Sequence, residues 1–121
     1  GVHRKPAQFY FARTAGLCRA VRAWLELNWP KEDGSTEREH LEAVEKQTGK
    51  RPEKLDTVRI PDGTERVWGM FLDLIGRMDW QSLDAYQRVT GREIDPHELS
   101  MLRAMDAEYS RFQSERIKEK H

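Results

Sequence analysis

Glu37 and His40 form a Glu-x-x-His pair, the pattern in this sequence that comes nearest to a metal site. Di-iron carboxylate sites need a second copy of this pair and two further glutamates from facing helices. The sequence contains no second copy. His3, His97 and His121 also lack a partner histidine four residues away, which is the spacing of helical zinc ligands. We therefore expect a solvated helix face at these residues and no metal.

Cys18 is the one cysteine, which excludes an intramolecular disulfide and any multi-cysteine zinc site. The neighbouring Arg19 could lower its pKa, but a single cysteine on a helix is more often a small buried hydrophobe. The sequence also lacks a nucleophile elbow, a phosphate loop and a dinucleotide fingerprint. It therefore predicts no catalytic residue, no enzymatic activity and no cofactor.

Residues 82–105 are predicted to form a helix, a glycine turn and a second helix, a pattern that also occurs in DNA-binding proteins. Recognition helices in such proteins carry basic or amide side chains where the DNA lies, whereas this helix would begin Asp95-Pro96-His97-Glu98. Only residues 1–30 are clearly basic, with five basic residues and one acidic residue. A small DNA-binding regulator is therefore the less favoured alternative, and nucleic acid is an unlikely partner.

Capping residues and apolar spacing divide the chain into helices. Thr36 with Glu39, and Asp95 with Glu98, form two capping boxes. Apolar residues recur at spacings of three and four between them. The predicted helices lie near residues 7–28, 36–48, 64–78, 81–90 and 95–116. We therefore expect an all-α fold, a compact bundle of about five helices.

Charge distribution predicts a division of the chain into parts. We expect a basic amphipathic N-terminal helix in 1–30, a linker in 31–35, a helical domain in 36–113 and a frayed polar tail in 114–121. A helix outside the main bundle has to cover its apolar face. The apolar stripe of the first helix therefore predicts a self-association surface formed by Leu17, Val21, Trp24 and Leu25.

The last predicted helix carries more large apolar side chains than one face can bury. Leu99, Leu102 and Met105 align with the bundle. Met101, Tyr109 and Phe112 lie off that line or beyond it, and exposed methionine and aromatic side chains are suited to binding a partner. These three residues are the predicted partner-binding site. Burial beneath the N-terminal helix is the equally weighted alternative.

Overall composition fits a single domain that stays in solution. The chain has 121 residues, no net charge and 35% charged residues, against about 25% in an average protein. No apolar run approaches the roughly 20 residues that span a bilayer. The sequence predicts a cytoplasmic protein without membrane contact.

Three blocks of the sequence carry a family resemblance. The first is 39–49 with Arg51, Pro52 and Leu55. The second is Val67, Trp68, Phe71, Leu72, Leu74 and Arg77, continuing to Ala85, Tyr86 and Gly91. The third is Glu98 with 102–106 and Tyr109. Together they resemble the tail assembly chaperones and related small tail proteins of long-tailed phages and prophages, over roughly residues 36–112.

The resemblance implies a non-enzymatic protein of the bacterial host cytoplasm that binds the tape measure protein, tail tube subunits or both during tail assembly. It also implies that the chain could be part of a longer product made by a ribosomal slip. Separately from the resemblance, the self-association surface on the first helix predicts a homo-oligomer. A permanent structural role in the virion is the second alternative to the chaperone role.

Overall fold

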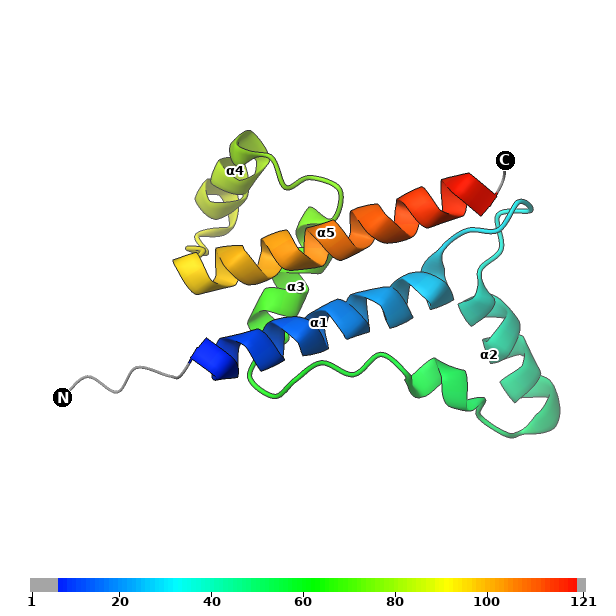
Figure 1. The fold of residues 1–121 in the computed structure, drawn as a ribbon. Helices are drawn as coiled ribbons and strands as arrows, with labels where there is room; N and C mark the ends of the chain where they lie inside the picture. Colours follow the sequence, from blue (N-terminus) through cyan, green and yellow to red (C-terminus); the bar gives the residue numbers. More distant parts are fainter. Residues whose placement is uncertain (1–6, 120–121) are drawn as a thin grey trace.

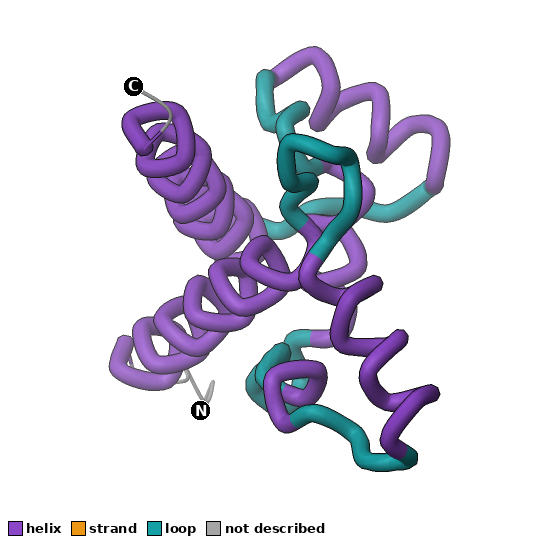
Figure 2. Tube along the Cα trace, turned by 90° about the vertical axis from the view of Figure 1, so that its right-hand side faces the viewer, coloured by secondary structure: helices purple, strands orange, loops and turns teal. Residues whose placement is uncertain are grey.

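The computed structural model describes residues 7–119, with side chains from Phe9 onward. In order, the helices are α1 (Ala7–Asn28), α2 (Glu37–Thr48), the 3₁₀ helix η1 (Glu53–Asp56), α3 (Glu65–Leu74), α4 (Trp80–Thr90) and α5 (Pro96–Glu119). The described part contains no strand, and no part of the tube in Figure 2 carries the strand colour. The all-α prediction is confirmed. His3 and His121, with the ends of the predicted N-terminal segment and tail, lie outside the described residues.

The two predicted capping residues at α2 and α5 act as caps. The Thr36 hydroxyl accepts a hydrogen bond from the Glu39 backbone N–H at 3.2 Å. At α5 the box is reciprocal: Asp95 Oδ1 accepts from the Glu98 N–H at 2.8 Å, and Glu98 Oε1 accepts from the Asp95 N–H at 3.1 Å. These bonds satisfy backbone donors that have no partner within the helix. Both helices therefore begin where these capping residues stand in the sequence.

Two predicted helix ends are wrong. α3 stops at Leu74 rather than at residue 78, because Ile75 is extended and Gly76 turns the chain with a φ of +76°. Only glycine adopts that left-handed conformation without steric cost. α5 continues to Glu119, so residues 114–119 are helical rather than a frayed tail.

α1 and α5 lie side by side and run in the same direction (Figures 1 and 2). The contacts follow both helices in register: Tyr10 stacks on His97 near their starts, and Trp29 packs on Phe112 towards their ends. α3 crosses this pair, while α2 and α4 lie at opposite ends of the molecule (Figure 1). α1 is therefore an integral part of the bundle.

The central core draws on α1, α3, α4, α5 and the loop after α3. Its buried members are Leu17, Val21, Leu25, Val67, Met70, Phe71, Leu74, Met78, Leu83, Met101, Leu102, Met105 and Phe112.

The predicted separation of residues 1–30 from the helical domain is therefore wrong. Leu17, Val21 and Leu25 are buried within the same chain, and Trp24 is half-buried against the core. α5 is long enough to cover the apolar stripe of α1 along most of its length. The reason for expecting self-association, an uncovered apolar face on α1, is thereby removed.

A cluster of ion pairs joins α1 to α5 beside the core. Arg22 Nε lies 2.6 Å from Glu108 Oε1, and its two Nη atoms contact the Glu115 carboxylate at 3.0 and 3.1 Å. Arg111 also binds Glu108. Burial alone would raise the pKa of Glu108, but the hydrogen bonds from Arg111 and Arg22 outweigh it and hold that pKa below its usual value. Glu108 is therefore buried as a charged carboxylate.

Replacing Glu108 by Gln is expected to cost about 1–3 kcal/mol at neutral pH, because charge-assisted hydrogen bonds are lost. The pKa of Glu108 is lower in the folded state, so its stabilisation is present above the unfolded value of about 4.3 and is lost as the pH falls through the folded value. Urea unfolding at several pH values should therefore show a smaller difference between wild type and variant below about pH 4. A difference that stays constant from pH 7 to pH 3 would contradict this assignment.

Candidate functional site

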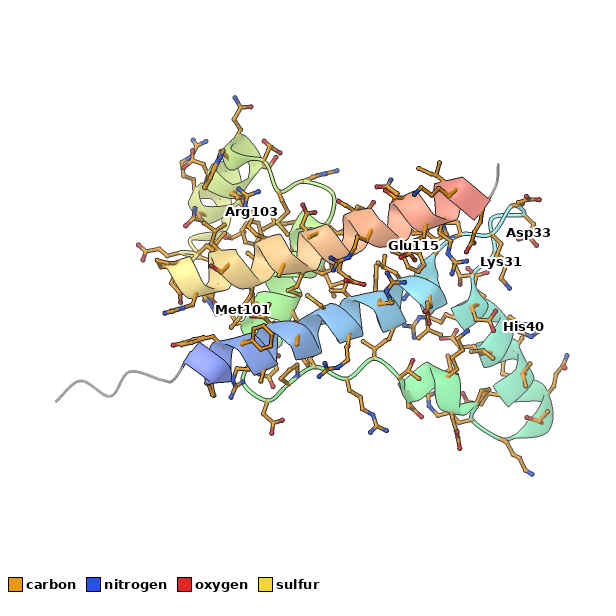
Figure 3. All side chains as sticks on the ribbon, viewed as in Figure 1. Lys31, Asp33, His40, Met101, Arg103 and Glu115 are labelled. Carbon is orange, nitrogen blue, oxygen red and sulfur yellow. The ribbon has the colours of Figure 1, made fainter. Side chains whose placement is uncertain are left out.

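Met101, Tyr109 and Phe112 are not an exposed surface. Met101 is 7% and Phe112 1% exposed, and Tyr109 is half-buried. In Figure 3 Met101 lies between α5 and α1. Trp29 covers the other two, with ring centroids 5.3 Å from Phe112 and 6.4 Å from Tyr109. The alternative, burial beneath the N-terminal helix, is what the structure has, because the end of α1 reaches the second half of α5.

The candidate metal and thiol residues have ordinary surroundings. Glu37 pairs with Lys31 at 3.1 Å, and that hydrogen bond lowers the pKa of Glu37. Within the described residues no three His, Cys, Asp or Glu side chains gather as a metal site would require. Cys18 is half-buried, and burial followed by the nearby Glu108 charge raises the pKa of its thiol. A raised pKa disfavours the thiolate, which is the reactive form.

Exposed large apolar side chains are the remaining candidates for an interaction surface. They are Phe11, Leu72, Trp80, Val89 and Ile117. Single exposed apolar residues are common on protein surfaces. Trp80 differs from the others because it is 70% exposed at the edge of an apolar groove between α4 and the start of α5.

We call this the Trp80 groove; it is lined by Trp80, Leu83, Asp84, Gln87, Ile94 and Leu99. Gln87 fixes its wall, because its side-chain oxygen accepts the Ile94 N–H at 2.8 Å and its amide donates to the Leu83 carbonyl at 3.3 Å. The groove therefore combines an apolar floor with polar groups that are already bonded within the chain.

Arg103 holds the tryptophan at the rim. Its guanidinium carbon lies 4.7 Å from the centroid of the Trp80 ring, and its Nη1 donates to the Met78 carbonyl at 2.5 Å. Figure 3 shows Arg103 on the side of α5 that faces α4. Asp79 caps α4 just before Trp80 by accepting the Ser82 N–H at 3.1 Å. Tryptophan and arginine are enriched among residues that dominate binding energy at protein interfaces.

Sequence reasoning missed this groove. Trp80 lies three residues before Leu83, so helical spacing places both on the same inward stripe. Only the position of α4 relative to α5 leaves Trp80 outside the core. Asp79, whose side chain caps α4, was the available signal that the helix begins at Trp80.

A family model described as phage tail assembly chaperone matches residues 44–111, which is more than half of the chain. The chain belongs to the phage tail assembly chaperone family. The match runs from the middle of α2 to Arg111 in α5 and contains all residues of the Trp80 groove. α1, which completes the core of this family member, lies before the match.

No curated protein and no solved structure matches the chain. None of the described helices is both long enough and apolar enough to cross a membrane. The family match therefore carries the identification of this tail assembly chaperone family member.

Proposed function

We propose that the chain binds tail tube subunits, the tape measure protein or both in the host cytoplasm while the phage tail is assembled, and that the Trp80 groove makes this contact. Membership of the tail assembly chaperone family supports the assembly role. The observation that supports the groove is the exposure of Trp80 beside an apolar surface. The other three tryptophans of this small chain are all at least partly buried.

An assembly chaperone has to release its partner. A short groove with one aromatic anchor suits moderate, reversible affinity, because few side chains become ordered on binding. Leu83, Ile94 and Leu99 offer apolar contact to one face of a helix or an extended segment. No chemical step is needed for such a role, and we propose none.

Trp80→Ala tests the groove. We expect binding to the tube or tape measure protein of the same phage to weaken at least tenfold, or about 1.4 kcal/mol, because the anchor is removed. Titration calorimetry with each purified partner measures it. Since Trp80 is largely exposed, the thermal midpoint should change little.

Val89→Ala is the matched control. Val89 is exposed on α4, the helix that begins at Trp80, but it does not line the Trp80 groove. It lies on the opposite side of α4, next to Tyr86 and Asp73. We expect unchanged affinity for this variant. Wild-type affinity in Trp80→Ala, or equal losses in both variants, would place the contact elsewhere.

A permanent virion component is the alternative role within the same phage setting. Mass spectrometry of purified virions separates the two roles. We expect peptides of this protein in lysates of infected cells and none in purified particles. Stoichiometric amounts in finished tails would identify it as a structural protein instead.

A further inference from the structure

A second pocket lies on another face, where the starts of α1, α3 and α5 meet. Phe9, Tyr10 and Arg13 come from α1, Thr64 and Val67 from the start of α3, and His97 from α5. Met101 also lines it. The aromatic wall is ordered by stacking, because the Tyr10 and His97 rings lie 4.0 Å apart and 4° from parallel. The pocket shares no lining residue with the Trp80 groove.

Arg13 is the unusual group in this pocket. It forms no hydrogen bond or ion pair with any residue in the part of the chain that the structure describes, and its Nε is buried without a partner. Its guanidinium carbon lies 4.0 Å from the centroid of the Phe9 ring. Gly63 is also close, since a Cβ added there would lie 3.0 Å from Arg13 Nη1. The charge is therefore held in place by an aromatic ring and a glycine rather than by an acid.

The other charged groups around the pocket already have partners. Asp95 and Glu98 form the capping box of α5, and Glu98 also accepts from Arg66 Nε at 2.9 Å. Arg66 donates in addition to the Glu93 carbonyl at 2.5 Å. Arg13 is thus the ionic group of the pocket that is left to bind an anion.

Helix α3 adds a second feature that favours an anion. Thr64 stands at its N-cap, but its hydroxyl donates to the Pro61 carbonyl at 2.5 Å, and the helix has no side-chain cap. Backbone N–H groups at the first turn of a helix, together with the helix dipole, attract negative charge. Both Thr64 and Val67 of this turn line the pocket beside Arg13.

The segment before Phe9 offers no acid to pair with Arg13. Residues 1–8, which precede the described side chains of α1, contain no aspartate or glutamate. With no acid of the described residues bound to it, Arg13 is open to a carboxylate from another molecule. Arginine binds carboxylates through two parallel hydrogen bonds, and the adjoining Tyr10 and Val67 side chains offer apolar contact.

We propose that this pocket binds an acidic peptide segment, with one carboxylate on Arg13 and a neighbouring apolar side chain against Tyr10 and Val67. The site is distinct from the Trp80 groove and does not depend on the function proposed for that groove.

The probe is acetyl-Leu-Glu-Leu-amide titrated into the full ¹⁵N-labelled chain, with acetyl-Leu-Gln-Leu-amide as the uncharged control. We expect the Nε–Hε signal of Arg13 and the backbone amides of Gly63 and Val67 to shift saturably with the Glu peptide. The Gln peptide should bind at least tenfold more weakly. In Arg13→Met, which keeps an unbranched apolar side chain, the Gly63 and Val67 shifts should be lost, whereas Arg19→Met, an exposed change on the same helix, should retain them.

Other outcomes overturn the proposal. They are equal binding of the two peptides, no saturable shift with the Glu peptide, or unchanged shifts in Arg13→Met. Inorganic phosphate is titrated in parallel. Saturation of the Arg13 signal by phosphate without any response to the Glu peptide would assign the pocket to phosphate and not to a peptide carboxylate.

Discussion

Removing residues 1–30 is expected to leave a chain that no longer unfolds cooperatively. α1 contributes Leu17, Val21 and Leu25 to the central core, each 2% exposed or less. Burial of a valine or leucine side chain contributes about 1.5–3 kcal/mol, and a whole domain is stable by only about 5–15 kcal/mol. The deletion also uncovers apolar side chains of α5, including Phe112. Circular dichroism during heating should show a broad loss of helix without a sharp midpoint.

A single substitution in the full chain tests the same packing. Leu17→Asp places a charge in the core and should lower the melting temperature of the protein strongly. Ala12→Asp, on an exposed part of the same helix, should leave the melting curve nearly unchanged. A truncated chain that melts as sharply as the intact protein would show that residues 31–121 form a domain without α1.

Phe112→Ala is expected to lower the free energy of unfolding by about 3–5 kcal/mol, because it leaves a cavity in a well-packed site. Phe112 is 1% exposed and contacts Trp29, and the Arg22 and Arg116 guanidinium groups lie over its ring at 5.6 and 4.7 Å. The measurement is urea unfolding followed by circular dichroism, with the midpoint and slope fitted together.

Phe11→Ala is the control for that substitution. It removes the same side chain from a position that is 77% exposed, so we expect a change within about 0.5 kcal/mol. If Phe112→Ala were as stable as Phe11→Ala, Phe112 would be available as a binding residue after all. The pair of variants therefore separates a packing role from a partner-binding role with identical chemistry.

Sequence determined the helices and part of the core because both depend on nearby residues. Thr36, Asp95 and Glu98 mark helix starts through bonds to backbone groups three residues away. Phe71 and Leu102 are buried as their helical spacing indicates, while Trp68 at the core margin is only half-buried. The blocks that resemble tail assembly chaperones lie largely within the matched residues 44–111.

Which apolar helix faces stay exposed to solvent depends on the tertiary structure. Spacing shows that Leu17, Phe112 and Trp80 each lie on an apolar stripe, but it does not show which stripe is covered by another helix. α1 and α5 cover each other, so Leu17 and Phe112 are buried, whereas α4 lies at one end of the molecule and leaves Trp80 exposed. The surroundings of Arg13 were likewise not predictable from spacing. Its pocket is formed by residues of α1, α3 and α5, which are distant in sequence and come together only when the chain folds.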